Sequence, residues 1–131
     1  MRLWHYRLIS VLPKDMLVSQ WRECIAIKRQ WEKGTLKHRL VKYVQYYNKG
    51  YFKNYFDLVL HEMKRRKIKY QDKFVNEIHD FCDMGLKTKY YNYPEHNERY
   101  LRQCYYNLQE KADRGIVSEE EWKTIEKFIR R

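Results

Sequence analysis

Glu23 is the acidic residue of this sequence that is best placed for chemistry, because nothing on its own predicted helix neutralises it. Residues three and four positions apart are neighbours on a helix, and the side chains at these distances from Glu23 are all uncharged. Glu32, by contrast, has Lys28 and Arg29 within the same reach. A carboxylate without a local cation is either an ordinary surface residue or an acid that another part of the chain must meet. The residues alone leave both interpretations open.

Two stretches of the sequence interleave lysines with aromatic residues, which combines cations for phosphates with flat rings for bases. The longer stretch covers residues 42–56, and the shorter one covers residues 87–93. We expect the shorter stretch to be a loop that contacts nucleic acid. Its candidate contact residues are Lys87, Lys89, Tyr90 and Tyr91. In the longer stretch, about half of the rings are also consistent with positions in a hydrophobic core.

The overall charge points in the same direction as these stretches. Lys and Arg number 28 against 17 Asp and Glu, which gives a formal net charge of +11 and a pI near 9.6. Such a balance favours a polyanionic partner, either nucleic acid or an anionic membrane surface. The densest basic run, residues 64–69, is ambiguous, because cations at the end of a helix are also expected from the helix dipole. We expect double-stranded DNA as the partner and no membrane.

Secreted, membrane-spanning and disulfide-rich proteins are disfavoured. No apolar run approaches the ~20 residues of a membrane span. The opening carries Arg2, His5 and Arg7 where a signal peptide needs an apolar stretch, so we expect a cytoplasmic protein. The three cysteines lie far apart without a C-x-x-C pair, so neither a disulfide framework nor a zinc module is indicated.

Common motifs for nucleotide, ester and metal chemistry are also missing from the sequence. It contains no G-x-x-x-x-G-K-[ST], no G-x-S-x-G and no H-E-x-x-H. We therefore expect no metal and no small-molecule cofactor, and we expect the protein to be a monomer.

Helical periodicity and helix-ending residues predict four helices that position these candidate residues. Apolar residues recur at the 3.6-residue period over 13–33, 51–67 and 94–114, and a short last helix begins at Ser118, whose spacing to Glu121 is that of a capping box. The prolines and glycines lie between these segments, as expected for residues that begin and end helices. The second helix has the clearest core positions, namely Phe52, Tyr55, Phe56, Val59, Leu60 and Met63.

The rest of the chain carries weaker signals. Residues 36–48 and 72–86 are each able to add a helical stretch, and no strand alternation or internal repeat occurs. A chain of 131 residues is long enough for one sizeable core. The sequence therefore predicts an all-α, compact single domain over residues 1–131. It has three main helices, a short C-terminal helix and an irregular N-terminal segment.

The first two dozen residues resemble a known family, the phage-type pyrimidine dimer DNA glycosylases. The opening MRLWH and the later Q-W-R-E-C stretch are most similar to the bacterial branch of this group. Weaker similarity continues through E-M-K-R-R and L-Q-E-K, so that most of the chain is covered. The positions that fall on the family pattern without a gap are Leu8, Ser10, Leu12, Leu17, Arg22 and Glu23.

The resemblance implies an all-helical fold whose N-terminal segment threads back between helices, and a function as a DNA glycosylase with abasic-site lyase activity. It implies that Glu23 is the catalytic acid and that Arg22 and Lys111 contact DNA phosphates. In the family, the nucleophile is the α-amine of a threonine exposed by removal of the initiator methionine. Here the second residue is Arg2, whose bulk blocks that removal, so the nucleophile is expected to be the α-amine of Met1, or another amine that takes its place. Arg2 itself is expected to bind DNA.

General pKa values and chain dimensions are consistent with this chemistry. An α-amine titrates near ~8 and is partly neutral at cellular pH, whereas a lysine titrates near ~10.4. Glu23 lies about 15 Å along its helix from Pro13, and twelve extended residues span up to about 40 Å, so the terminus can fold back to it. Two alternatives stay open. One is a non-catalytic nucleic-acid-binding protein that has lost the nucleophile, and the other is a helical protein whose basic surface binds an acidic protein.

Overall fold

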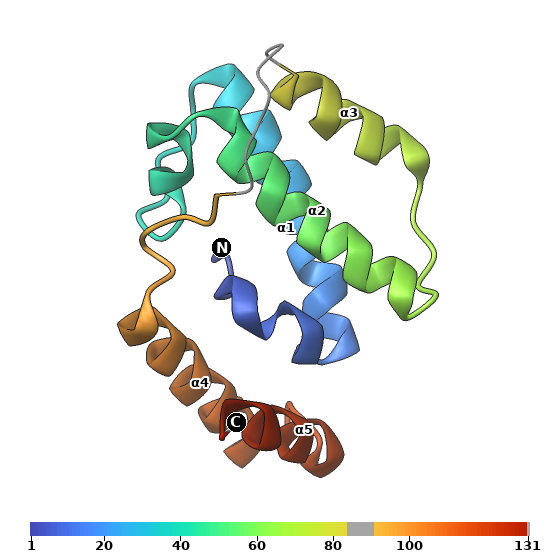
Figure 1. Cartoon of the computed structure of the whole chain (residues 1–131), viewed down its shortest axis with the longest axis vertical. Coiled ribbons are helices and arrows are strands. Elements are labelled where there is room, and N and C mark those ends of the chain that lie inside the picture. Colours follow the sequence, from blue (N-terminus) through green and yellow to red (C-terminus); the bar gives the residue numbers. More distant parts are fainter. Residues whose placement is uncertain (84–90, 131) are drawn as a thin grey trace.

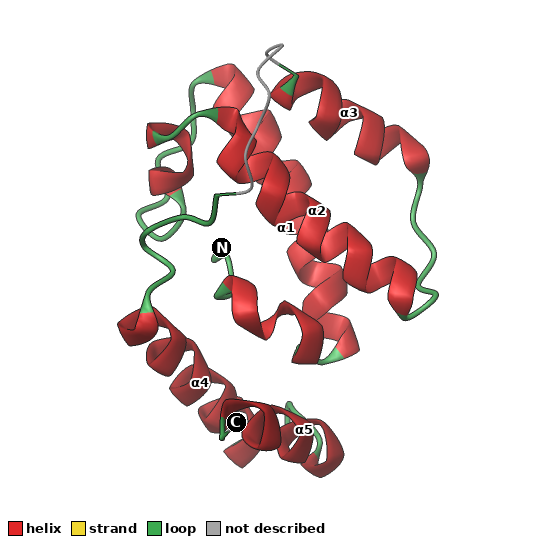
Figure 2. Ribbon diagram, in the orientation of Figure 1, coloured by secondary structure: helices red, strands yellow, loops and turns green. Residues whose placement is uncertain are grey.

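In a computed structural model, residues 1–83 and 91–130 are described, and within them the chain forms only helices and irregular segments (Figure 2). The prediction of an all-α fold is therefore confirmed. The α-helices are α1 (Lys14–Lys33), α2 (Lys49–Arg65), α3 (Asp72–Cys82), α4 (Glu98–Asp113) and α5 (Glu119–Ile129). The 3-10 helices η1 (Tyr6–Val11) and η2 (Lys42–Tyr46) precede α1 and α2. No helix in these described ranges is long and apolar enough to cross a membrane.

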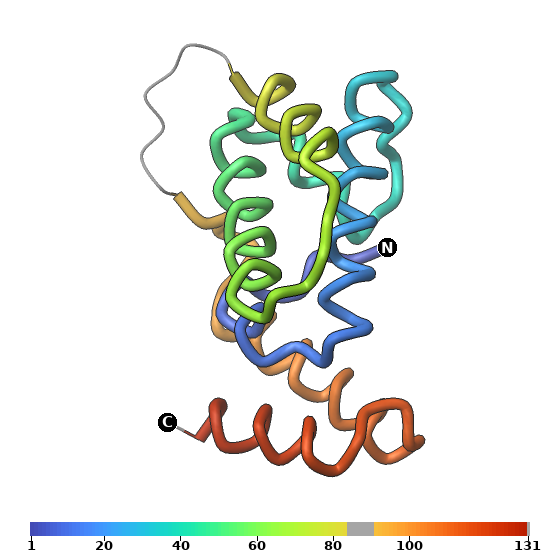
Figure 3. Tube along the Cα trace, turned by 90° about the vertical axis from the view of Figure 1, so that its right-hand side faces the viewer, coloured from blue at the N-terminus to red at the C-terminus, as the bar shows by residue number. Residues whose placement is uncertain are grey.

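The N-terminal segment lies between two groups of helices. α1 and α2 pack against each other, and α3 packs on both of them. η1 contacts α2 on one side and α5 on the other, and α4 pairs with α5. Figure 1 shows the first residues in the centre, between the α1–α2 pair and α4, and Figure 3 shows α5 running across one end of that pair. This arrangement confirms that the N-terminal segment threads between helices.

Side-chain caps decide where α2 and α4 begin. α2 begins two residues earlier than expected, because the Asn48 side chain accepts a hydrogen bond from the Gly50 N–H at 2.9 Å. Gly50 therefore lies inside the first turn of α2, and the expectation that every glycine lies between helices is wrong for it. α4 begins four residues later than expected, because the Asn97 side chain accepts a hydrogen bond from the Tyr100 N–H at 2.9 Å.

Other helix ends follow their local sequence signals. α1 ends at Gly34, whose φ of 71° is the left-handed conformation that glycine adopts without strain. α5 has the predicted capping box, in which Ser118 and Glu121 each accept a hydrogen bond from the other's backbone N–H. The N-terminal segment is not irregular throughout, because η1 buries Leu8 and Ile9. A 3-10 turn this short has no 3.6-residue period by which the sequence would reveal it.

The hydrophobic core joins α1 and α2 to the N-terminal segment and extends to buried residues of α3, α4 and α5. All predicted core positions of α2 are buried. Lys28, which interrupts the apolar stripe of α1, is also buried, with 8% of its side chain exposed. Its ammonium pairs with Glu32 at 3.2 Å and with Glu77 of α3 at 3.3 Å, so that the buried charge is compensated. Of the two weaker stretches, residues 72–86 contain α3 and residues 36–48 contain η2.

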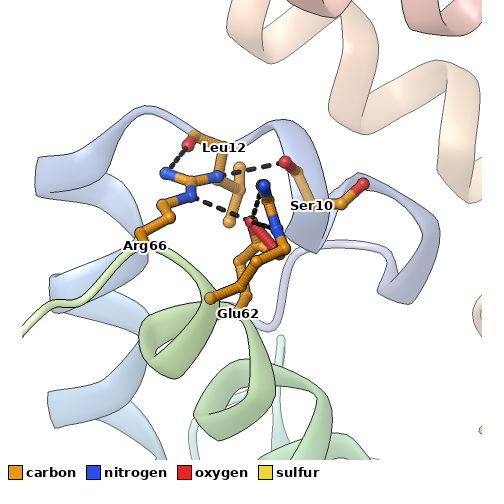
Figure 4. A network of polar contacts seen from close by, with 5 residues as sticks. Ser10, Leu12, Glu62 and Arg66 are labelled. Carbon is orange, nitrogen blue, oxygen red and sulfur yellow. Dashed lines mark hydrogen bonds and ion pairs between the residues drawn. The ribbon is translucent and has the colours of Figure 1, made fainter.

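Arg66, at the C-terminal cap of α2, holds the end of the N-terminal segment in place (Figure 4). Its guanidinium donates to the carbonyl oxygens of Leu12 at 2.7 Å and Ser10 at 3.1 Å, and to the Glu62 carboxylate at 3.0 Å. Burial alone would raise the pKa of Glu62, but hydrogen bonds from Arg65 and Arg66 lower it overall. Two cations of the densest basic run therefore have structural partners.

Candidate active site at the N-terminus

A polar cleft of about 490 Å³ opens where the chain terminus meets α1, α4 and the segment that follows α1. The terminus contributes Met1 and Arg2, α1 contributes Gln20 and Glu23, and α4 contributes Lys111. We call this the N-terminal cleft. Its other lining residues are Trp4, Met16, Ser19, His38, Leu40, Asn107, Glu110 and Arg114. The fold thus brings together four of the predicted site residues, which come from both ends of the chain.

Glu23 meets the backbone of the folded-back terminus. Its Oε2 accepts a hydrogen bond from the Arg2 backbone N–H at 3.3 Å and another from Gln20 Nε2 at 3.2 Å. Consecutive backbone nitrogens are at most about 3.7 Å apart, so the Met1 amine lies within about 7 Å of this oxygen. The carboxylate that lacks a partner on its own helix therefore faces the first residues of the chain.

Buried and partly buried side chains from three helices hold residues 2–4. Gln20 of α1 donates to the Arg2 carbonyl at 3.0 Å and accepts from the Trp4 N–H at 2.8 Å. The Tyr55 hydroxyl of α2 donates to the Trp4 carbonyl at 2.6 Å, and the Tyr100 hydroxyl of α4 donates to the Leu3 carbonyl. Leu3 is fully buried. The terminus is therefore a fixed part of the fold rather than a free end.

A buried histidine, His96, accepts a hydrogen bond from the backbone of Tyr6, further along the same segment. His96 Nδ1 accepts a hydrogen bond from the Tyr6 N–H at 3.2 Å, so the proton of the neutral ring lies on Nε2 and faces the Tyr43 hydroxyl at 2.7 Å. Burial, assisted by the nearby His5, lowers the pKa of His96 to about 3. His96 is therefore neutral at cellular pH and remains an acceptor for the backbone.

Two cations in the N-terminal cleft have no carboxylate partner in the described part of the chain. The Arg2 guanidinium lies over the Trp4 ring, with its Cζ 5.1 Å from the ring centre. Neither Arg2 nor Lys111 takes part in any of the ion pairs between described residues, whereas Arg114 pairs with Glu110 at 3.9 Å. Arg2 and Lys111 are thus available to an anion that enters the cleft.

Comparison with known proteins places the chain in a family. A family model described as pyrimidine dimer DNA glycosylase matches residues 1–76, which is more than half of the chain. The chain belongs to the pyrimidine dimer DNA glycosylase family. The matched residues contain Met1, Arg2, Arg22 and Glu23, but they end before α4 and its Lys111. No curated protein and no solved structure shows a significant match to the chain.

Arg22, a candidate DNA contact of this family member, lies outside the N-terminal cleft. It is exposed on α1 and borders a separate groove of about 770 Å³, whose apolar floor includes Trp21, Met63 and Phe74. No residue lines both the groove and the cleft. Successive residues of a helix point about 100° apart, so Arg22 and Glu23 are neighbours in the chain on different faces of α1.

The described residues of the aromatic and basic stretches do not line the cleft. Lys87, Lys89 and Tyr90 lie outside the described residues. Tyr91 is exposed and stacks on Tyr51, with ring centres 5.5 Å apart, but it does not line the cleft. In the longer stretch, Phe52 and Tyr55 are buried, as the core interpretation predicts, and the hydroxyls of Tyr43 and Tyr47 bond to His96 and Glu95.

Sequence reasoning missed several residues that shape the site, chiefly Gln20, His38, Tyr55 and Tyr100. His38 lines the cleft and accepts a hydrogen bond from the Leu40 N–H through Nδ1 at 3.3 Å. The helical period predicts Tyr55 only as a core residue. Gln20 is one of the uncharged neighbours of Glu23 on α1, and nothing local in the sequence marks it as a residue with distant partners.

Proposed function

We propose that the protein is a DNA glycosylase with abasic-site lyase activity that acts on pyrimidine dimers in duplex DNA. The α-amine of Met1 is the nucleophile, and Glu23 is the catalytic acid and base. The observation that carries this proposal is the hydrogen bond from the Arg2 N–H to Glu23, which brings the start of the chain to an acid in an open cleft. Membership of the pyrimidine dimer DNA glycosylase family supports the choice of substrate.

The first stage replaces the damaged base by the protein. The neutral amine attacks C1′ of the flipped-out nucleotide, and the C1′–N bond breaks with its electron pair leaving on the base. The Glu23 carboxylate stabilises the positive charge that develops on the sugar and accepts the proton released by the amine. The C1′–O4′ bond then breaks with its electron pair on O4′, and Glu23 gives O4′ the proton that it accepted, so that Glu23 is again a carboxylate. The nitrogen lone pair forms the second bond to C1′, which gives a protonated imine between C1′ and the Met1 nitrogen.

The second stage cuts the strand. Glu23 removes a proton from C2′, and the electrons of that C–H bond form a C2′–C3′ double bond as the C3′–O bond breaks and the phosphate leaves. Hydrolysis of the imine restores the amine. Arg2 and Lys111, the two unpaired cations of the cleft, hold the phosphates on either side of the reacting sugar.

Borohydride trapping tests this function, because the reagent reduces the imine to a stable amine. We expect the protein to form a covalent adduct with a duplex that contains an abasic site, and with one that contains a pyrimidine dimer, but not with undamaged duplex. Mass spectrometry of the adduct should place it on Met1. An adduct on Arg2 would show that Met1 is removed after all, and the absence of any adduct would contradict the enzymatic function.

The alternative on the same scaffold is a DNA-binding protein without catalysis, and the presence of Arg2 in place of the family's N-terminal threonine favours it.

Both functions require the protein to bind DNA, and this binding is expected to weaken as the salt concentration rises. If Arg2, Arg22 and Lys111 each neutralise one phosphate, the Kd should rise about 40-fold between 50 and 200 mM salt. A fluorescence titration at the two salt concentrations measures this, and a Kd that does not change with salt would contradict nucleic-acid binding.

A further inference from the structure

Gln20 occupies a central position beneath the N-terminal cleft. It lies on α1 one turn before Glu23, and only 1% of its surface is exposed. Its Nε2 lies 3.0 Å from the Arg2 carbonyl oxygen and 3.2 Å from Glu23 Oε2, while its Oε1 lies 2.8 Å from the Trp4 nitrogen. A buried amide therefore contacts both the N-terminal backbone and the acid.

These neighbours determine the orientation of the Gln20 amide. Nε2 has two hydrogens, and both of its partners, the Arg2 carbonyl and Glu23, are acceptors. Oε1 faces a donor, the Trp4 N–H. A flipped amide would place Oε1 against two oxygens and Nε2 against an N–H, so that none of these three hydrogen bonds of Gln20 could form.

The contacts form a closed ring of three hydrogen bonds. The Arg2 N–H donates to Glu23 Oε2, Gln20 donates to the same oxygen, and Gln20 also donates to the Arg2 carbonyl. Arg2 is thus held through both its N–H and its carbonyl, and the acid is held through one oxygen. Because each member of the ring bonds to the other two, none can shift without breaking a hydrogen bond.

We infer that Gln20 is the positioning residue of this site: its amide holds the N-terminal backbone and the Glu23 carboxylate in one fixed relation. The inference rests on the proposed function, in which the amine and the acid must act on the same sugar. A nucleophile and an acid held at a fixed separation need not be brought together in each turnover, and a displacement of about 1 Å can cost about 100-fold in rate. Gln20 touches no reacting atom.

Two variants separate positioning from simple packing. Gln20→Met keeps the approximate size of the side chain but removes the hydrogen bonds of the amide to Arg2, Trp4, Tyr55 and Glu23. Tyr55→Phe is the matched control, because it removes the hydroxyl that lies 2.6 Å from the Trp4 carbonyl oxygen and 3.1 Å from Gln20 Oε1. It leaves the donor that Gln20 offers to Glu23 in place. Both variants are expected to lower the melting temperature. Only Gln20→Met changes the contacts of the acid.

The measurements are the single-turnover rate of borohydride trapping on an abasic-site duplex and the Kd for that duplex. For Gln20→Met we expect a rate about 100-fold lower with an unchanged Kd, because the acid and the N-terminal backbone lose their fixed relation. For Tyr55→Phe we expect a rate much closer to that of the parent, because Gln20 still donates to Glu23. Equal rates for the two variants would overturn the inference and leave Gln20 with a packing role alone.

A second variant covers the case in which Gln20→Met does not fold. Gln20→Glu keeps the shape and the acceptor for the Trp4 N–H, but it has no N–H to donate to the Arg2 carbonyl or to Glu23. The trapping rate should again fall by about 100-fold, and a rate equal to that of the parent overturns the inference. A parent protein that forms no adduct contradicts the proposed function itself, whereas a parent adduct with variants as fast as the parent contradicts only the role of Gln20.

Discussion

Replacing Glu23 by glutamine is expected to lower the rate of strand cleavage at an abasic site by about 100-fold to 10,000-fold, with folding and DNA binding nearly unchanged. The amide oxygen can take the place of Oε2 and accept the same hydrogen bonds from the Arg2 N–H and from Gln20. What is lost is the negative charge that stabilises the cationic sugar and the ability to move a proton. Single-turnover cleavage of an abasic-site duplex, together with the melting temperature, measures the effect.

The control for Glu23→Gln is a variant of the neighbouring residue, Arg22. Arg22→Gln is expected to weaken binding and to reduce the dependence of log Kd on log salt by about 1, the contribution of one phosphate contact. Because Arg22 lies on another face of α1, outside the N-terminal cleft, cleavage at saturating DNA should remain near the parent rate. If Glu23→Gln cleaves as fast as the parent, Glu23 is an ordinary surface acid and the non-catalytic alternative takes the place of the enzyme.

Acetylation of the Met1 α-amine is expected to abolish imine trapping altogether. An amide nitrogen has no lone pair available for attack on C1′, whereas a neutral amine has one. As classes, α-amines titrate near ~8 and lysines near ~10.4, and this difference allows an α-amine to be acylated selectively at neutral pH. Borohydride trapping on an abasic-site duplex, before and after acylation, gives the result directly.

DNA binding is the control for the acetylated protein. The reagent leaves the guanidinium of Arg2 and the other cations in place. The Kd and its salt dependence should therefore change by no more than the contribution of one phosphate contact. Continued trapping after complete acylation of Met1 would contradict the mechanism. It would point to a lysine nucleophile, for which Lys111 of the same cleft is the first candidate.

Local sequence signals determined most of the helical framework. The apolar period of α2 predicted its buried face, the Ser118 capping box predicted the start of α5, and Gly34 marks the end of α1. Each of these signals depends on residues within one or two helical turns, where spacing alone decides which side chains are neighbours. The same local reasoning marked Glu23 as an acid without a partner on its own helix.

Tertiary structure alone decided what Glu23 meets. Its partners include the backbone N–H of Arg2, and the Arg2 carbonyl bonds in turn to Gln20, while Tyr100 holds Leu3 across a separation of 97 residues. A backbone N–H is present at nearly every residue and carries no mark in the sequence. Which N–H reaches an acid is decided by how the helices pack and by where the chain turns back. The sequence therefore identified the acid and its helix, and the packing of α1, α2 and α4 around the first four residues created the site.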